Sequence, residues 1–179
     1  MVNLAIIGLG RWGRVLVDAV QGKTDLVQFT NAVTRTPSKV EDYCKANSIT
    51  LTSDYSTILS DPKIDGVVLA TPHSQHEQQI IDAVRARKHV FCEKPPGRTA
   101  AEVRDVISIE NQNPGSVLMY GFNHRFHHSV RDALKIVEEG SLGAVVNMRG
   151  VYGKSQIKTF NLDGYTSLLK KILFTKYKK

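Results

Sequence analysis

The chain has 179 residues, with 24 Lys and Arg against 17 Asp and Glu, so its formal net charge is +7. Apolar residues make up 41% and charged residues 23% of it, which is ordinary for a globular domain and excludes a chain that is disordered throughout. Residues 151–179 hold seven Lys and one acidic residue, Asp163, so they carry +6 of this charge and residues 1–150 carry +1. Because nucleic-acid-binding proteins usually have their basic surplus on the folded domain, we expect no nucleic-acid partner.

Membrane insertion, secretion and a disulfide framework are equally unexpected. The longest uncharged apolar run is far short of the roughly 20 residues that cross a bilayer. Residues 1–10 contain no basic segment and no small-residue cleavage site, so they do not resemble a secretory signal. Two cysteines, Cys44 and Cys92, cannot build a disulfide framework and offer no metal-ligand spacing. We therefore expect a cytoplasmic protein without a bound metal.

Two hydrophobic patterns alternate along the first two thirds of the chain. Short apolar runs predict strands, and apolar residues three or four positions apart predict helices. The first predicted helix carries Val15, Leu16, Ala19 and Val20 on one face and ends at Gly22. In chain order, we expect strands at residues 2–7, 26–33, 49–51, 65–70, 89–92 and 116–120, with helices at 39–46, 74–87 and 100–110. This alternation predicts an α/β fold, a doubly wound and mostly parallel sheet with helices on both faces.

The pattern changes after residue 121. Residues 128–139 have the spacing of an amphipathic helix. Residues 144–152 alternate in a way that predicts a longer strand of a second, separate sheet. These signals fade near residue 155. We therefore expect one domain at 1–121, the beginning of a second at 122–154, and a Lys-rich tail at 155–179.

The segment Gly8-Leu9-Gly10-Arg11-Trp12-Gly13 matches G-x-G-x-x-G and connects the first predicted strand to the first predicted helix. In such a loop Gly8 permits a tight turn, Gly10 lets the backbone approach a pyrophosphate, and Gly13 allows the helix to pack closely on the strand. Free N–H groups at the helix start, those of Arg11 and Trp12 included, would bind the phosphates. The motif predicts a dinucleotide-binding loop, and the alternative is a plain strand-to-helix turn.

The second predicted strand ends at residue 33. Thr34 and Arg35 follow it, in the region where dinucleotide-binding folds select the ribose. A carboxylate there would bond the 2′-hydroxyl of NAD, but this segment contains none, and Lys39 lies nearby in the sequence. Thr34 can hydrogen-bond a phosphate oxygen, and Arg35 can pair with it or stack on the adenine. The sequence therefore favours NADP(H), with NAD(H) as the alternative. The simpler interpretation of Arg35 is an exposed loop arginine.

Two further segments follow predicted strands at the same expected edge of the sheet, where open α/β sheets bind ligands. In the first, Thr71 and Pro72 would form a wall against the cofactor, and His73 or His76 would face the cleft. The alternative for each histidine is a surface position at a helix start. In the second, which contains Glu93 and Lys94, the lysine ammonium would donate to a substrate hydroxyl or share its proton during hydride transfer. The alternative there is a solvated ion pair.

Four segments together, residues 5–13, 70–76, 93–95 and 121–127, resemble the Gfo/Idh/MocA family of oxidoreductases. The resemblance implies an N-terminal NAD(P)-binding Rossmann domain followed by a C-terminal α/β domain, which would be truncated in this chain. It also implies an NAD(P)-dependent oxidoreductase that acts by hydride transfer on a hydroxyl or keto group of a sugar, cyclitol or related compound. Members of the family form homo-oligomers through the open C-terminal sheet, and the oligomeric state of this chain stays open.

The resemblance also implies roles for individual residues. Lys94 would be the catalytic lysine that contacts substrate and cofactor. Glu93 and the segment from Thr71 to His76 would border the nicotinamide. Asn123 and His124 would contact the substrate.

The chain departs from the family near its end. A D-x-G-x-H-x-x-D motif, which carries the family's general acid/base histidine, is absent, and no histidine follows His128. The tail suggests either a reading frame that shifted near residue 155 or a natural short form, and the abrupt change in composition favours the first. A dinucleotide-binding module without catalysis is therefore the alternative function.

Overall fold

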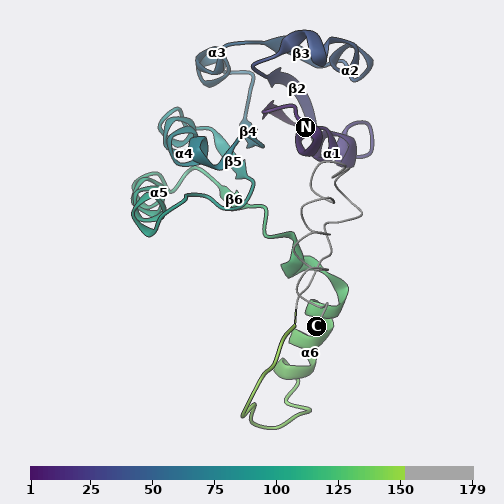
Figure 1. Cartoon of the computed structure of the whole chain (residues 1–179), viewed down its shortest axis with the longest axis vertical. Helices are drawn as coiled ribbons and strands as arrows, with labels where there is room; N and C mark the ends of the chain where they lie inside the picture. Colours follow the sequence, from purple (N-terminus) through teal and green to yellow (C-terminus); the bar gives the residue numbers. More distant parts are fainter. Residues whose placement is uncertain (152–179) are drawn as a thin grey trace, which may run out of the picture. The chain divides into compact units, whose positions relative to one another are not determined.

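The computed structural model describes residues 1–151, and it divides the chain into two compact units (Figure 1). The first unit is Met1–His127, and the second begins at His128. The predicted tail at 155–179 lies outside the described residues. No helix among residues 1–151 is long and apolar enough to span a membrane.

A six-stranded parallel sheet forms the centre of the first unit. Its order is β3-β2-β1-β4-β5-β6, and every neighbouring pair is parallel. The strands are β1 (Val2–Ile7), β2 (Val27–Val33), β3 (Thr50–Thr52), β4 (Gly66–Leu69), β5 (His89–Cys92) and β6 (Leu118–Tyr120). The predicted doubly wound sheet is therefore confirmed. The central strands β1, β4 and β5 are found from sequence because they are mostly buried and read as largely apolar runs.

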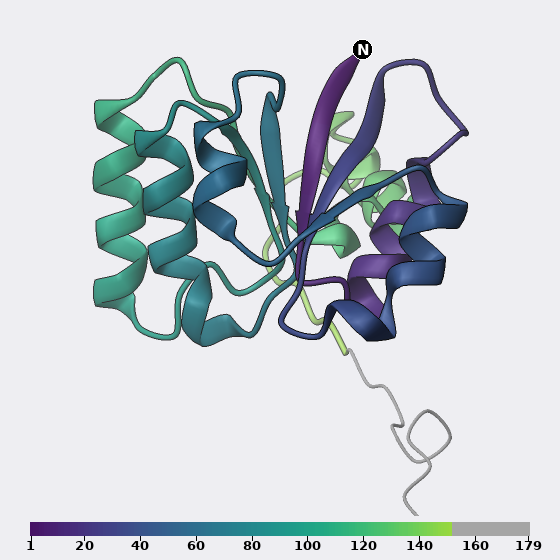
Figure 2. The same ribbon diagram turned by 90° about the horizontal axis from the view of Figure 1, so that it is seen from above.

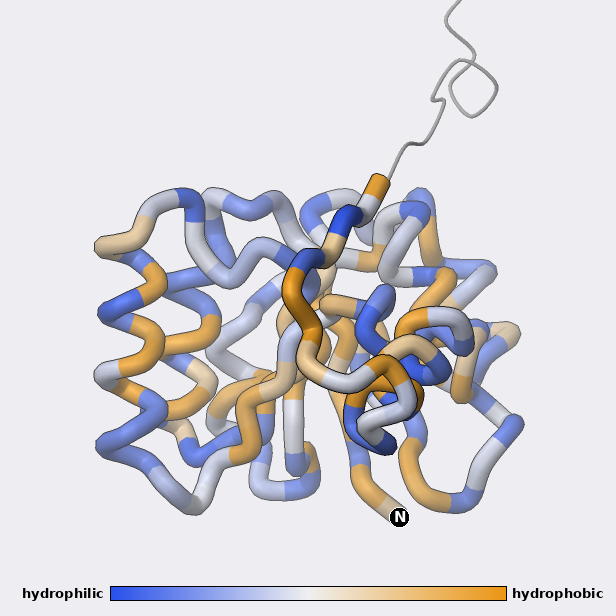
Figure 3. Tube along the Cα trace, turned by 90° about the horizontal axis from the view of Figure 1, so that it is seen from below, coloured by the Kyte–Doolittle hydropathy of each residue, from blue (hydrophilic) through white to orange (hydrophobic). Residues whose placement is uncertain are grey.

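Helices cover both faces of this sheet, as Figure 2 shows, with α1 and α2 on one side and α3, α4 and α5 on the other. The α-helices are α1 (Arg11–Val20), α2 (Glu41–Ala46), α3 (Tyr55–Ser60), α4 (His76–Arg85) and α5 (Ala100–Gln112). Three 3₁₀ turns join them: η1 (Pro37–Lys39), η2 (His73–Gln75) and η3 (Asn123–Phe126). Figure 3 shows hydrophobic and hydrophilic residues alternating along α5, which is the pattern of a helix with one buried face.

Each face of the sheet has its own hydrophobic core. In β1, Ala5 and Ile7 belong to the core under α3, α4 and α5, whereas Ile6 belongs to the core under α1 and α2. Successive side chains of a strand point to opposite faces, so one short apolar run supplies both cores. The last residues of the strands are in register, because Ile7 lies opposite Val33 and Leu69. The segments that follow the strands therefore all start at one edge of the sheet.

The packed face of α1 agrees with the prediction in part, because Leu16 and Val20 are half-buried and pack against the core as predicted, but Val15 and Ala19 do not. Val17 and Gly13 are buried against the sheet, while Val15 is 45% exposed and Ala19 is also exposed. Gly13 has no side chain, so the helix approaches the sheet most closely there, and Val17, one turn later, packs on the same side. The apolar spacing of Val15 and Ala19 is equally good for a helix, but it marks a face that the fold does not bury.

Two other elements differ from prediction. Helix α3 was not expected; it begins after Asp54, whose Oδ1 accepts a 2.8 Å hydrogen bond from the Ser56 N–H as an N-cap. Residues 144–151 form no strand, although their alternating pattern predicts one, and Tyr152 lies outside the described residues. A strand needs a neighbour to satisfy its backbone, and the described part of the second unit contains only the helix α6 (His128–Glu138), which confirms the helix predicted there.

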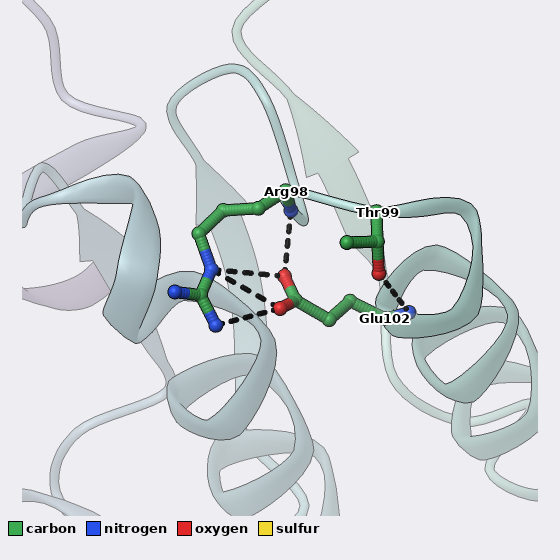
Figure 4. Close-up of polar contacts among 3 residues, drawn as sticks. All are labelled: Arg98, Thr99 and Glu102. Carbon is green, nitrogen blue, oxygen red and sulfur yellow. Dashed lines mark hydrogen bonds and ion pairs between the residues drawn. The ribbon is translucent and has the colours of Figure 1, made fainter.

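An exposed cluster holds the loop before α5 (Figure 4). The Thr99 Oγ1 accepts a 3.2 Å hydrogen bond from the Glu102 N–H and caps the helix. The Glu102 carboxylate accepts hydrogen bonds from the Arg98 Nη2 at 2.7 Å and from the Arg98 backbone N–H at 2.6 Å. These bonds tie the segment that follows Lys94 to the start of α5.

The Glu102→Gln variant is expected to lose less stability in acid than the wild type. The hydrogen bonds from the Arg98 side chain and backbone hold the pKa of Glu102 below its ordinary value. A carboxyl group of this kind stabilises the fold above its unfolded pKa of about 4.3, and the contribution is lost as the pH falls through the lower folded value. Thermal unfolding between about pH 7 and about pH 2 measures the difference. Equal acid losses in both proteins would contradict this assignment, and Glu110→Gln on the same helix is the control.

Candidate cofactor site

A cleft of about 350 Å³ opens at the carboxyl edge of the sheet. It lies where the strand order reverses between β1 and β4, which is the position at which doubly wound sheets bind ligands. The glycine loop and the segments that follow β2, β3 and β4 line it. The lining residues are Ile7, Gly8, Leu9, Gly10, Val33, Thr34, Arg35, Thr36, Ser53, Tyr55, Ala70, Thr71, Pro72, Gln75 and Gln79.

The three glycines of the loop have three different surroundings. Gly8 has a φ of +94°, and a Cβ there would lie 2.8 Å from the Ala70 carbonyl oxygen. A Cβ on Gly13 would overlap the carbonyl oxygen of Gly8. A Cβ on Gly10 would meet no atom within 4 Å. Gly8 and Gly13 are therefore required by the fold, whereas the missing side chain of Gly10 leaves open space in the cleft.

The N-terminus of α1 points its free backbone N–H groups toward the same loop. Gly10 is the N-cap and supplies no side-chain hydrogen bond, and the first turn contains no acidic residue. A helix start of this kind carries partial positive charge and unsatisfied donors. Open space at Gly10 beside these donors fits an anionic pyrophosphate. The side chains of Arg11 and Trp12 are exposed and do not line the cleft.

Thr34 and Arg35 line the part of the cleft that follows β2. Thr34 is half-buried and Arg35 is exposed. Behind them, the Arg14 Nη2 donates a 3.0 Å hydrogen bond to the Lys39 carbonyl, and its guanidinium lies 5.1 Å from the centre of the Tyr43 ring. These contacts fix the turn η1 next to the helix α1.

Thr71 and Pro72 form the wall after β4. The Thr71 hydroxyl donates a 2.6 Å hydrogen bond to the Gln79 Oε1, and the Tyr55 hydroxyl donates a 2.9 Å bond to the Gln79 carbonyl. Burial raises the pKa of Tyr55 well above its ordinary value, so its hydroxyl remains a donor. Four polar lining residues, Thr36, Ser53, Tyr55 and Gln79, were not among the predicted site residues, whereas Gln75 lies in the segment from Thr71 to His76 that was predicted to border the nicotinamide.

The two predicted histidines have different surroundings. His73 is exposed, and its ring lies 5.6 Å from that of His76. His76 is fully buried at 0% exposure. Its Nδ1 lies 2.7 Å from the Pro95 carbonyl oxygen and its Nε2 lies 2.9 Å from the Thr71 carbonyl oxygen. The expectation that His76 faces the cleft does not match this geometry, because a sheet-side helix start buries its ring and no ring nitrogen is left for a ligand.

Glu93 and Lys94 follow β5 at the same edge of the sheet. The Glu93 N–H donates a 2.9 Å hydrogen bond to the Leu69 carbonyl, and a Cβ on Gly121 would lie 2.8 Å from the Glu93 Oε1. Lys94 is exposed, and the peptide bond to Pro95 is cis. Cys92, the last residue of β5, has a structural thiol. Burial, with a smaller effect of the Glu93 charge, raises the pKa of this thiol to about 12.

Asn123 and His124 begin the turn η3 after β6, and both are exposed. The register of the strands places the starts of all these segments along one edge, since Cys92 lies opposite both Leu69 and Tyr120. Of the predicted site residues, the cleft brings together Gly8, Gly10, Thr34, Arg35, Thr71 and Pro72. The lining of the cleft does not include Arg11, Trp12, Gly13, His73, His76, Glu93, Lys94, Asn123 or His124.

Residues 2–122 match the family model GFO_IDH_MocA, which describes an oxidoreductase family with an NAD-binding Rossmann fold. The chain belongs to the Gfo/Idh/MocA oxidoreductase family. The predicted resemblance is therefore confirmed, and nicotinamide dinucleotide is the cofactor class of this fold.

Known relatives of this Gfo/Idh/MocA chain include dehydrogenases of cyclitols. It is 32% identical over 139 residues to the oxidoreductase YrbE of Bacillus subtilis, covering 77% of this chain and 40% of that protein. It is 28% identical to myo-inositol 2-dehydrogenase of Thermotoga maritima, covering 79% and 42%. The solved structure of scyllo-inositol dehydrogenase from Lactobacillus casei with bound NAD(H) and scyllo-inositol superposes with a TM-score of 0.75 at 28% identity, covering 80% and 42%. The chain thus spans about two fifths of the length of these relatives.

Proposed function

We propose that this chain is the cofactor-binding part of an NAD(P)-dependent oxidoreductase that transfers hydride to or from a hydroxyl or keto carbon of a sugar, cyclitol or related compound. The observation that carries this proposal is the cleft at Gly10, where open space meets the uncapped start of α1. The bound NAD(H) and scyllo-inositol of the Lactobacillus casei relative support it.

Each segment at the carboxyl edge has a part in this proposal. The N–H groups of the glycine loop bind the pyrophosphate, and Thr34 with Arg35 holds the adenosine ribose. Thr71 and Pro72 support the nicotinamide, which when bound supplies the chemistry of accepting or donating a hydride. Lys94 donates a hydrogen bond to the reacting oxygen and shares its proton. Asn123 and His124 orient the substrate.

Turnover of a panel of polyols and cyclitols with NAD and NADP, followed by the absorbance of the reduced nicotinamide, tests this function. Appearance of reduced cofactor with any member of the panel supports an oxidoreductase. A second candidate, a dinucleotide-binding module without catalysis, is favoured by the lining of the cleft, which holds the glycine loop and Thr34 but not Lys94. Saturable cofactor binding without turnover supports the second candidate, and absence of cofactor binding contradicts both.

The cofactor is proposed to be NADP(H) in preference to NAD(H), on the basis of Thr34 and Arg35 in the cleft wall. Arg35→Ala is expected to weaken NADPH binding about tenfold, since a charge-assisted hydrogen bond to the 2′-phosphate is lost. NADH has no such phosphate, so its dissociation constant should change less than about twofold. Calorimetric titration of both cofactors measures the difference, with the exposed Arg104→Ala on α5 as control. Equal weakening of both cofactors would remove the argument for NADP.

The cellular setting of this enzyme is proposed from its cysteines and its family. Cys44 and Cys92 are both buried and unpaired, which agrees with a reducing compartment such as the cytoplasm. The proposed partners are a small sugar-like substrate and further copies of the protein, without nucleic acid.

A further inference from the structure

The side chain of His76 joins two segments that the sequence separates. Its Nδ1 lies 2.7 Å from the carbonyl oxygen of Pro95, after β5, and its Nε2 lies 2.9 Å from the carbonyl oxygen of Thr71, after β4. Carbonyl oxygens only accept hydrogen bonds, so a neutral imidazole, which has one N–H, donates to one of these two oxygens and only contacts the other, whereas the protonated ring donates to both. The ring therefore bridges the two segments from inside, at 0% exposure.

Both bridged segments belong to the proposed site. Thr71 lines the cofactor cleft, and its hydroxyl is fixed by the 2.6 Å hydrogen bond to the Gln79 Oε1. Pro95 directly follows Lys94 in the chain. The two nitrogens of the His76 ring thus contact the backbone of the cleft wall at Thr71 and the backbone next to Lys94 at Pro95.

Lys94 depends on its backbone for its position. Its side chain is exposed, and it forms no hydrogen bond or ion pair with the part of the chain that the structure describes. Four residues after Lys94, Arg98 is tied to Glu102 (Figure 4), and one residue after Lys94 the Pro95 carbonyl contacts His76. A shift of about 1 Å at a reacting group is enough to slow an enzyme strongly, so a contact that fixes the backbone has a functional effect.

We propose that His76 is a positioning residue, whose buried ring sets the place of Lys94 relative to the Thr71–Pro72 wall of the cofactor cleft. It touches neither cofactor nor substrate. The expected effect of His76 on cofactor binding rests on the proposed function. The contacts of His76 with the Thr71 and Pro95 carbonyls are present in the cofactor-free protein.

The bridge is tested without cofactor by ¹³C-methylating the lysines and following the methyl signal of Lys94, assigned with Lys94→Arg. His76→Phe keeps an aromatic ring and removes both ring nitrogens, so the Lys94 signal is expected to shift or broaden. His76→Gln restores one donor and should bring the signal partly back. Lys63, exposed at the opposite edge of the sheet, is the internal control. A Lys94 signal that stays unchanged in both folded variants overturns the proposal.

The effect on the site is tested by calorimetric titration with NADH and with ADP-ribose, which lacks the nicotinamide. Because His76 also contacts the Thr71 carbonyl in the wall that supports the nicotinamide, His76→Phe is expected to weaken NADH about tenfold and ADP-ribose less than about twofold, with His76→Gln in between and the exposed Lys63→Met unchanged. Equal weakening of both ligands means a general structural role and overturns the proposal. If His76→Phe fails to fold, His76→Gln provides the same comparison. If the wild type binds neither ligand, the proposed function fails while the lysine signal still decides the bridge.

Discussion

Replacing Gly13 with alanine is expected to lower the free energy of unfolding by about 3 kcal/mol. The new Cβ would overlap the carbonyl oxygen of Gly8. This oxygen belongs to the backbone of a loop that is itself held, since the Gly8 N–H donates a 2.8 Å hydrogen bond to the Val33 carbonyl. The clash can be relieved only by moving α1 away from the sheet, which loosens the buried packing of Val17.

Gly10→Ala is the matched variant, with the same chemical change three residues earlier. Its Cβ meets no atom within 4 Å, and Gly10 has a φ of −76° that alanine adopts without strain. We expect the free energy of unfolding to change by less than about 1 kcal/mol. Binding of NADH should weaken about tenfold or more, because the methyl group occupies the space into which the pyrophosphate fits.

Thermal unfolding and cofactor titration of the two variants separate the two roles of the loop. The expected pattern is a stable protein that binds poorly for Gly10→Ala and a destabilised protein for Gly13→Ala. A stable Gly13→Ala protein would contradict the close approach of α1 to the loop. Unchanged cofactor binding by Gly10→Ala would contradict the placement of the pyrophosphate.

Lys94→Met is expected to lower kcat about 100-fold or more, if the chain turns over a polyol. Methionine keeps an unbranched side chain of similar length and removes the ammonium that donates to the reacting oxygen. Because Lys94 is exposed and lies outside the lining of the cleft, the stability of the fold and the affinity for NADH should be nearly unchanged. Loss in kcat without loss of cofactor affinity therefore marks a group that acts on the substrate.

Steady-state turnover and NADH titration are measured together for this variant. Lys63→Met, an exposed lysine at the opposite edge of the sheet, is the control and should behave like the wild type. Full activity of Lys94→Met would contradict the role proposed for the lysine. A large loss of NADH affinity would instead assign Lys94 to the cofactor.

The sheet could be predicted almost completely because its central strands, β1, β4 and β5, are short, largely apolar and mostly buried runs. Strands β1 and β5 occupy the predicted residues, and the other four strands differ at their ends. The packed face of α1 could be predicted only in part, because Val15 and Val17 are equally apolar and only the close approach at Gly13 selects Val17. The strand predicted at 144–152 failed for a different reason: alternation indicates a strand but does not supply its neighbour.

The lining of the cleft agrees with the sequence where a motif imposes backbone geometry and differs from it where burial decides. The glycine loop, Thr34, Arg35 and Thr71 line one cleft because the register of the strands aligns their ends. His76 was expected in the cleft, yet its ring is buried, since sequence spacing does not show which side of a helix start faces the sheet. Gln79 was missed because a glutamine four residues after Gln75 is equally typical of the solvent-exposed face of a helix.

Titration of the protein with NADH and NADPH, followed by the fluorescence of Trp12, tests the central claim most directly. Trp12 is the single tryptophan of the chain, it lies in the glycine loop, and it is 41% exposed. We expect saturable quenching with a dissociation constant below about 1 mM for at least one of the two cofactors, and a clear weakening in Gly10→Ala. No saturable change in Trp12 emission with either cofactor would contradict the assignment of this cleft to a nicotinamide dinucleotide.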